Sequence, residues 1–274
     1  MKKLMKITII ISMLLGIFTL YSCSSQTTEL STVEIEIFDI GKADAILIDT
    51  GSHCVLIDTG ETDDGSTILE YLIDNNIGYI DYLIITHFDN DHIGGAPYIV
   101  NSIGVGEVIQ PDYDKTSNEY IQYSSAVLNK NIPIVNLTEN MQFTLDSADF
   151  TIYPPKENNY DDDNDYSLVT SLKHGDMSLL FAGDADKDRL TEIISQGNLE
   201  HTFLKVPHHG DYNKMSKDFL NAVNPEYAVI TCSDKNKESK KIMKILDDLG
   251  TKVYLTRNGD VNCISNGKSI TINQ

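Results

Sequence analysis

The sequence is poor in basic residues and cysteines, and it contains no Cys-x-x-Cys pair. Only 21 Lys and Arg residues stand against 41 Asp and Glu residues, which gives a formal net charge of −20 at pH 7. A broad non-specific surface for nucleic acid needs clustered Lys and Arg, so this balance argues against one. It leaves a phosphodiester substrate open, because bound metal ions can supply positive charge locally. Zinc ligation by paired thiolates has no support.

The N-terminal apolar run is too short for a membrane span, which needs about 20 residues. Ile7 to Leu20 follows a basic start, as in a signal peptide, and leads to Leu20-Tyr21-Ser22-Cys23, which is similar to a bacterial lipoprotein cleavage box. We therefore predict a signal peptide over 1–22, a lipid anchor on Cys23 and a polar tether over 23–31. The alternative is an uncleaved signal anchor with an incidental cysteine. Either arrangement places the globular part at the extracytoplasmic face of the cell membrane.

The other three cysteines do not form a disulfide framework. Cys54, Cys232 and Cys263 lie in apolar, strand-like stretches, and an odd number cannot all pair internally. We therefore predict that they are buried free thiols. The remaining residues, 32–274, are enough for one α/β domain with a substantial core, and no second domain or short-period repeat is visible.

The most informative segment is Leu83 to Gly95, which reads LIITHFDNDHIGG. Four candidate metal ligands fall within six positions of it: His87, Asp89, Asp91 and His92. An apolar run precedes them and two glycines follow, a pattern that predicts a buried strand ending in a tight ligand loop. Imidazole and carboxylate ligands together suit Zn²⁺, Mn²⁺ or Fe²⁺. The alternative is an acidic surface turn that contains two histidines by chance.

Two later segments have the same design. An apolar strand at 178–182 leads to Gly183 and Asp184, and another at 202–206 leads to His208 and His209. Taken singly, Asp184 could be a helix N-cap and the histidine pair an ordinary polar turn. Three strands that each end in ligand-type residues and glycine instead favour one shared site, since strand ends are where α/β frameworks present their chemistry. We therefore predict a metal centre.

These segments resemble the metallo-β-lactamase superfamily, and within it the hydrolase-like domain of the ComEC family of competence proteins in a stand-alone form. The resemblance rests on six stretches in family order: Phe38-Asp39-Ile40-Gly41-Lys42-Ala43-Asp44-Ala45, Val55-Leu56-Ile57-Asp58-Thr59-Gly60, the His87–His92 cluster, Asn164-Asp165-Tyr166-Ser167-Leu168-Val169, Gly183-Asp184, and Val206-Pro207-His208-His209-Gly210. Together they span nearly the whole predicted mature chain. The resemblance implies an α/β fold of four layers, the αβ/βα sandwich, with the metals between its two halves.

The resemblance also implies a ligand set for two divalent ions, Zn or Mn. His87, Asp89 and Asp184 would hold one ion, while Asp91, His92, Asp184 and a C-terminal histidine would hold the other. Asp184 would bridge the two ions. Two cations held close together lower the pKa of a shared water and clamp the attacking and leaving oxygens. A carboxylate at position 89 in place of imidazole shifts the preference from zinc toward manganese or mixed occupancy.

Three positions depart from the commoner pattern. Asp89 stands where the wider superfamily usually has a His, although the ComEC branch shares the aspartate. The third-motif region offers Asn164 and Ser167 but no histidine, so the ligand there is Asn164, Ser167 or none. Asp211 follows His-His-Gly where that branch more often has Ser or Thr.

Adjacent residues in an extended segment point apart, so His208 and His209 are not expected to bind one metal together. We assign metal ligation to His209 and protonation of the leaving group or phosphoryl contact to His208, and the opposite assignment stays open. Asp186, two residues after the bridging carboxylate, is a candidate for orienting substrate or water. Asp91 is a candidate catalytic residue as well as a ligand. By resemblance, Asp58 is a structural aspartate behind the metal loop. The Asp49 and Asp58 pair belongs to one hairpin, so it is not a catalytic pair of the aspartic-protease kind.

Hydrophobic periodicity and turn residues predict alternating strands and helices. Strands are predicted over 33–40, 43–49, 54–57, 81–85, 107–110, 132–135, 141–145, 150–153, 167–173, 178–182, 202–206 and 227–230, followed by three terminal strands. Helices are predicted over 67–75, 95–103, 118–128, 187–196, 214–222 and 237–249. Gly94 and Gly95 would let the following helix approach the metal loop closely, its N-terminus facing an anionic substrate.

The sequence therefore predicts a lipid-anchored, metal-dependent hydrolase that acts on a phosphoester, most plausibly a phosphodiester. Its substrate would be nucleic acid outside the cell, with a connection to DNA uptake, or phosphodiester-linked envelope material. By analogy with the transmembrane part of ComEC, the resemblance makes a membrane channel protein a candidate partner, although the sequence alone does not establish one. The alternative from another class is a non-catalytic, metal-containing lipoprotein that binds envelope material. The oligomeric state is left open by the sequence.

Overall fold

The computed structural model of the protein describes residues 30–274. The predicted signal peptide, Cys23 and nearly all of the predicted tether lie outside the described residues. Within the described range, none of the helices has the length and apolar character that crossing a membrane requires.

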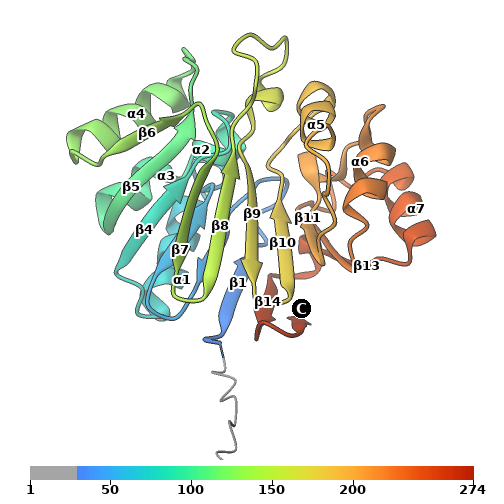
Figure 1. Ribbon diagram of the computed structural model, residues 1–274. Helices are drawn as coiled ribbons and strands as arrows, with labels where there is room; N and C mark the ends of the chain where they lie inside the picture. Colours follow the sequence, from blue (N-terminus) through green and yellow to red (C-terminus); the bar gives the residue numbers. More distant parts are fainter. Residues whose placement is uncertain (1–29) are drawn as a thin grey trace, which may run out of the picture.

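Two mixed β-sheets form the centre of the molecule (Figure 1). The larger sheet has eight strands in the order β15 (Ile270–Asn273), β14 (Val261–Ser265), β1 (Val33–Ile37), β2 (Ile46–Asp49), β3 (Cys54–Ile57), β4 (Tyr79–Ile84), β5 (Gly104–Pro111) and β6 (Ile134–Leu137). The smaller sheet has seven strands in the order β13 (Lys252–Leu255), β12 (Tyr227–Ile230), β11 (Phe203–Lys205), β10 (Met177–Phe181), β9 (Val169–His174), β8 (Ala148–Tyr153) and β7 (Met141–Leu145). The chain returns to the first sheet with its last two strands.

Helices cover the outer face of each sheet (Figure 1). The helices of the first half of the chain pack on the larger sheet, and those of the second half pack on the smaller one. The first sheet is covered by α1 (Gly65–Asp74), α2 (Asn90–Ile93), α3 (Ala96–Ser102) and α4 (Asn118–Asn129). The second is covered by α5 (Lys187–Ile194), α6 (Ser216–Val223) and α7 (Lys240–Leu249). Single turns of 3₁₀ helix occur at η1 (Asp163–Tyr166), η2 (Pro207–Gly210) and η3 (Thr256–Asn258).

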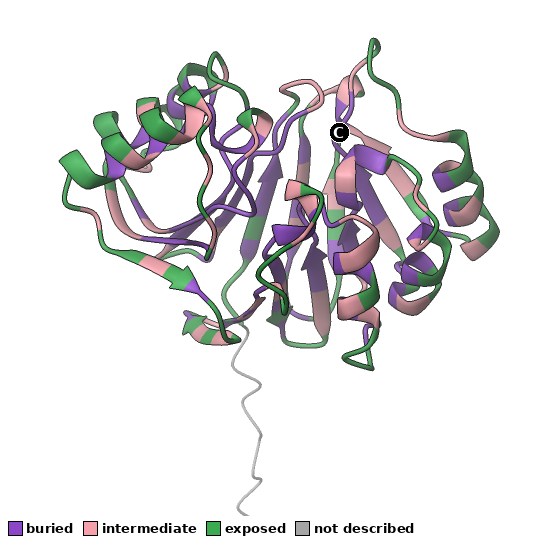
Figure 2. Cartoon of the chain, turned by 90° about the horizontal axis from the view of Figure 1, so that it is seen from above, coloured by how far each residue is buried: buried purple, intermediate pink, exposed green. Residues whose placement is uncertain are grey.

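Three hydrophobic clusters hold these layers together. One lies between the sheets and combines side chains of both, such as Ile35 and Ile48 from the first and Phe150 and Phe181 from the second. The other two lie between each sheet and its helices. Buried residues accordingly follow the sheets, while exposed residues gather on the outer sides of the helices (Figure 2). The order helix–sheet–sheet–helix confirms the predicted four-layer α/β sandwich.

The predicted elements are present, and three differences lie beside the predicted site. The strand predicted over 43–49 begins only at Ile46. The backbone of Asp44 makes its hydrogen bonds outside the sheet: its N–H donates to the Asp91 carbonyl (3.1 Å), and its carbonyl accepts from the Gly60 N–H (2.8 Å). The strand predicted over 167–173 begins at Val169. Helix α2 was missed because one turn is too short to show a helical period.

The free cysteines are as predicted. Cys54, Cys232 and Cys263 are all buried, and none of them forms a disulfide. Burial raises the pKa of the Cys54 thiol and that of the Cys263 thiol to about 12, so neither is ionised near neutral pH.

The glycine pair after the ligand cluster allows backbones to pack directly on one another. A Cβ placed on Gly95 would lie 2.2 Å from the Thr59 carbonyl oxygen and 2.9 Å from the Gly65 Cα, and one on Gly94 would lie 2.4 Å from the Thr62 nitrogen. These contacts press the start of α3 against the segment that follows β3. The positions of β3, β4 and α1 around the site therefore depend on the absence of side chains here.

We expect Gly95→Ala to lower the free energy of unfolding by about 3 kcal/mol, because the added methyl group meets backbone atoms that cannot turn away. Gly78→Ala is the matched control, since a Cβ there meets nothing within 4 Å. Its effect should stay within about 0.5 kcal/mol of wild type. Urea unfolding followed by circular dichroism measures both, and equal stabilities of the two variants would contradict the packing argument.

Candidate metal centre

The site begins at the carboxyl end of β4, which runs parallel to β3 and β5. The chain leaves this strand at Thr86, passes through the buried His87, and enters α2 with Asp89 as its N-cap residue. Asp91 and His92 lie in the single turn of α2, and His92 is fully buried. The strand end and the short helix thus present four candidate ligands from one loop.

Asp58 supports this loop from behind, as the resemblance implied. Its Oδ1 accepts from the Thr86 backbone N–H at 2.8 Å and its Oδ2 from the Thr86 hydroxyl at 2.7 Å. Oδ2 also lies 2.7 Å from His92 Nδ1. Asp58 adopts a left-handed backbone with φ of 59°, and these hydrogen bonds hold that conformation. Because Asp58 takes Nδ1, His92 is left with Nε2 free to face the site.

Asp184 reaches the site from the second sheet, just beyond β10. Gly183, with φ of 52°, turns the chain, and the Asp184 backbone N–H donates to Ser167 Oγ at 3.2 Å. His209 arrives from η2, the turn after β11, also with a left-handed φ of 52°. Its Nδ1 lies 2.8 Å from Thr231 Oγ1, whose own proton goes to Asp44. His209 Nδ1 is therefore the donor, and its Nε2 points into the site.

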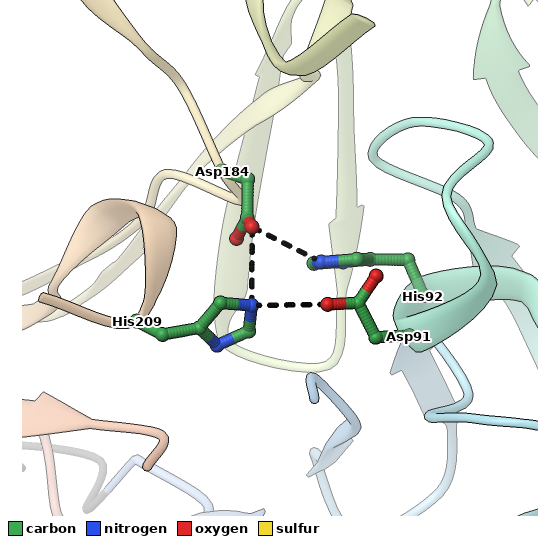
Figure 3. Close-up of side chains that lie close together, drawn as sticks. All are labelled: Asp91, His92, Asp184 and His209. Atoms are coloured by element: carbon green, nitrogen blue, oxygen red, sulfur yellow. Dashed lines mark ion pairs between the residues drawn. The ribbon is translucent and has the colours of Figure 1, made fainter. Parts of the chain in front are cut away.

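Four side chains converge here from both halves of the sandwich (Figure 3). His209 Nε2 lies 3.0 Å from Asp184 Oδ2 and 3.5 Å from Asp91 Oδ2, and His92 Nε2 lies 3.4 Å from Asp184 Oδ2. One potential ligand atom from each of the four residues lies within 4.8 Å of those from the other three. This is a mixed imidazole and carboxylate donor set, suited to a divalent transition-metal ion.

The hydrogen bonding of these atoms is incomplete. Among the described residues, five buried side-chain N or O atoms have no hydrogen-bond partner, and four of them belong to predicted ligands: His87 Nε2, His92 Nε2, Asp184 Oδ1 and His209 Nε2. Buried polar atoms are ordinarily paired, because leaving one unpaired costs about 1–3 kcal/mol. The residues therefore fit a metal ion, which would complete the bonding of these atoms.

Asp184 and the two histidines shift one another's pKa values. Burial by itself lowers the pKa of His92, but the carboxylates of Asp184 and Asp58 raise it well above the ordinary value. Burial also lowers the pKa of His209, but the negative charge of Asp184 outweighs this effect, and the pKa is raised. The two imidazoles in turn hold the pKa of Asp184 well below its usual range, although burial alone would raise it.

The predicted second ligand pair is more open. His87 Nε2 lies 3.7 Å from Asp89 Oδ2, and the other Asp89 oxygen contacts the ammonium of Lys115. The third-motif region adds no imidazole: Ser167 Oγ accepts from the Asp184 backbone, and Asn164 lies in η1. His87 and Asp89 do not belong to the four-residue group above.

His208 and Asp186 lie beside the centre and outside that group. The expectation of an extended segment at the two neighbouring histidines is wrong: both have left-handed backbone, with φ of 50° at His208, and their ring centroids lie 6.3 Å apart. The His208 side chain is 26% exposed, and its Nε2 lies 4.0 Å from Asp211 Oδ2. Asp186 is the N-cap residue of α5, and Asn213 Nδ2 donates to its carboxylate. Their catalytic roles stay predictions.

Sequence reasoning missed the buried pair Asp44 and Lys205. The Lys205 ammonium is fully buried at the end of β11, in contact with Asp44, 3.2 Å from the Gly183 carbonyl and 3.7 Å from Asp184 Oδ1. It supplies positive charge directly behind the predicted bridging carboxylate. A lysine inside an otherwise apolar strand next to the histidine pair was the signal that could have found it.

Comparison with known proteins identifies the class. The sequence pattern of the Metallo-beta-lactamase superfamily matches residues 39–233, so the chain belongs to that superfamily. Similar curated proteins are ComE operon protein 3 of Bacillus subtilis, 24% identical over 88% of this chain and 34% of that protein, and competence protein ComA of Neisseria gonorrhoeae, 28% identical over 74% and 27%. These are competence proteins of the ComEC family, which confirms the resemblance. The chain spans between about a quarter and a third of the length of these relatives.

Solved structures support the fold alone, because the identities are low. The metallo-beta-lactamase fold protein YhfI from Bacillus subtilis superimposes with a TM-score of 0.54 at 11% identity, over 81% of this chain and 96% of that one. CmlA, a diiron beta-hydroxylase from Streptomyces venezuelae, gives a TM-score of 0.52 at 12% identity, over 83% and 53%.

Asp184→Ala should remove most of the bound metal, because Asp184 faces both histidines of the centre and no other described carboxylate lies within 3.4 Å of either Nε2 atom. Elemental analysis of protein loaded with Mn²⁺ or Zn²⁺ and then desalted measures this. Asp176→Ala, in the exposed turn between β9 and β10, is the control and should keep wild-type metal content. A folded wild type that takes up neither ion would contradict the assignment of this centre.

Proposed function

We propose that the protein is a metal-dependent phosphodiesterase that acts on nucleic acid outside the cell. The observation that carries the proposal is the convergence of unpartnered imidazole and carboxylate atoms from both halves of the sandwich. Membership of the superfamily supports hydrolysis as the reaction class. Phosphodiester-linked envelope material is the second substrate class.

The centre would hold two divalent ions, Zn²⁺ or Mn²⁺. Asp91, His92, Asp184 and His209 would form the first site, while His87 and Asp89 together with Asp184 would form the second. Bound ions supply two kinds of chemistry here: they lower the pKa of a water molecule, and they neutralise charge that develops on phosphoryl oxygens.

The chain's own residues would do the remaining work. Asp58 and Thr231 fix the two imidazoles through their Nδ1 atoms, so both Nε2 atoms stay directed at the centre. His208, half-buried beside the centre, would give its proton to the leaving oxygen. Asp186 would position substrate or water at the start of α5, where Asn213 already orients its carboxylate. The buried ammonium of Lys205 would hold the bridging carboxylate in place.

Nucleic acid is favoured over envelope polymers by the relatives. Two of them are named competence protein ComA and Recombination protein 2, and the latter is 28% identical over 73% of this chain and 24% of that protein. The formal charge of −20 means that the substrate would be held mainly at the metal centre, without a broad basic surface.

The proposal includes attachment to the membrane. A lipid on Cys23 would hold the domain at the extracytoplasmic face, and a membrane channel protein would be its partner in DNA uptake. The N-terminal sequence pattern supports the anchor, and the relation to competence proteins supports the partner.

A direct test is turnover of bis-p-nitrophenyl phosphate with added Mn²⁺ or Zn²⁺, followed by incubation with single-stranded DNA, duplex DNA and a phosphorylcholine ester. We expect metal-dependent hydrolysis of the model diester and of at least one form of DNA. Hydrolysis of the phosphorylcholine ester alone would shift the substrate to the envelope. Metal uptake and binding of envelope material without any turnover would establish the non-catalytic alternative.

The histidine pair separates ligation from proton transfer. His209→Ala should reduce both metal occupancy and turnover, whereas His208→Ala should keep the metals yet slow hydrolysis of an alkyl phosphodiester by on the order of 10²-fold. A p-nitrophenyl diester should suffer less from His208→Ala, because its leaving group needs no protonation. Equal losses on the two substrates would instead show that His208 acts by positioning.

Anchoring has its own test. Cys23→Ser should release the protein from the membrane fraction or leave its signal peptide uncleaved, because the proposed lipid attaches to the Cys23 thiol. Fractionation of cells followed by mass spectrometry of the mature N-terminus measures both. A Cys23→Ser protein that is processed and retained like wild type would rule out the lipid anchor.

A further inference from the structure

A lysine contacts one of the predicted metal ligands directly. Lys115 lies in the loop between β5 and α4, and its ammonium contacts Asp89 Oδ1 and lies 2.8 Å from Asp163 Oδ2. Its side chain is 22% exposed, against 34% for Asp89 and 43% for Asp163. The lysine thus joins two loops at the mouth of the site, one after β5 and the other before β9.

Tyr113 fixes this contact, two residues before the lysine. Its ring stacks on Tyr166 with centroids 4.0 Å apart and packs against Phe88 at 4.5 Å. Its hydroxyl also accepts from the Phe88 backbone N–H at 2.8 Å. Phe88 lies between His87 and Asp89 in the chain, so the loop that carries Lys115 is attached to the same segment that carries the ligands. The position of the ammonium over Asp89 is therefore built into the fold.

The two oxygens of Asp89 face different partners. Oδ2 lies 3.7 Å from the unpartnered Nε2 of His87, and Oδ1 contacts Lys115. An ion bound by His87 and Asp89 would therefore lie close to a fixed positive charge. Two cations at such a separation repel each other, and this repulsion is strong where water is partly excluded. In the four-residue group, Asp184 also has a cationic neighbour, but Lys205 Nζ lies 3.7 Å from its Oδ1, whereas the Lys115 ammonium is in direct contact with Asp89 Oδ1. Asp91 and His209 have ion pairs only with Asp and His residues in the described chain.

We infer that Lys115 competes with the second metal ion for Asp89, so that the two sites of the centre fill in sequence. This inference rests on the proposed metal-dependent function. The first ion enters the group formed by Asp91, His92, Asp184 and His209. The second ion binds only at higher concentration, because it must displace the ammonium from Asp89. Asp163 then keeps Lys115 at the mouth of the site.

The test is calorimetric titration of chelator-treated protein with Mn²⁺, with bound metal counted by elemental analysis. Wild type should bind in two steps, the second at least tenfold weaker than the first. Lys115→Met should strengthen the second step by about tenfold or more and leave the first unchanged, whereas Lys115→Arg, which keeps the charge, should behave as wild type. Lys42→Met is the matched control, because Lys42 pairs at 2.7 Å with Asp211, which is not a predicted ligand, and is 29% exposed.

The outcomes separate this inference from the proposed function. A second step that is unchanged or weakened in Lys115→Met would overturn the competition, as would an equal gain in Lys42→Met. Absence of Mn²⁺ binding to wild type would overturn both the inference and the metal-dependent function. The expected binding pattern without hydrolysis of any phosphodiester would support the inference and overturn the function alone.

Discussion

Buried negative charge between the two sheets is the constraint on which the rest of this structure depends. Asp44, Asp58 and Asp184 are 1%, 0% and 3% exposed. Carboxylates removed from water are costly unless positive charge and hydrogen bonds compensate them. Lys205 and the two imidazoles with raised pKa provide part of that compensation. Among the described residues, four of the five buried side-chain atoms without a hydrogen-bond partner belong to His87, His92, Asp184 and His209. A divalent cation among these residues completes the balance.

This constraint accounts for three of the seven non-glycine residues with left-handed backbone in the described chain. Asp58, His208 and His209 have left-handed conformations that non-glycine residues rarely adopt, and Gly183 makes the same kind of turn. Each bends the chain sharply at a strand end, which brings a side chain from one sheet toward those of the other. Close backbone packing at Gly95 fixes the position of the loop that follows β4. The strain is offset by the hydrogen bonds of Asp58 and Thr231.

The fold and most of the centre could be predicted because they are encoded locally. Each ligand segment follows an apolar strand and has a glycine beside or shortly after its ligands, so Asp91, His92, Asp184 and His209 stand out in the sequence, and they meet in the structure. Lys115 and Lys205 could not be found this way. Their partners are remote along the chain, and only the tertiary fold brings the Lys205 ammonium to Asp44 or the Lys115 ammonium to Asp89. The short helix α2 and the left-handed turn at His208 and His209 likewise depend on tertiary contacts, which hydrophobic periodicity in the sequence does not reveal.

The central claim is that this cluster is a metal centre whose ligands include His92 and His209. The most direct measurement is calorimetric titration of chelator-treated protein with Zn²⁺ at pH 6.5 in two buffers of different ionisation enthalpy. Neighbouring carboxylates raise the pKa of both histidines above the ordinary value, which favours the imidazolium form in the metal-free protein. An imidazolium has to release one ring proton before its Nε2 can bind the ion. We predict binding with net proton release, seen as a binding heat that differs between the buffers. Binding with no proton release, or no binding at all, would contradict the account.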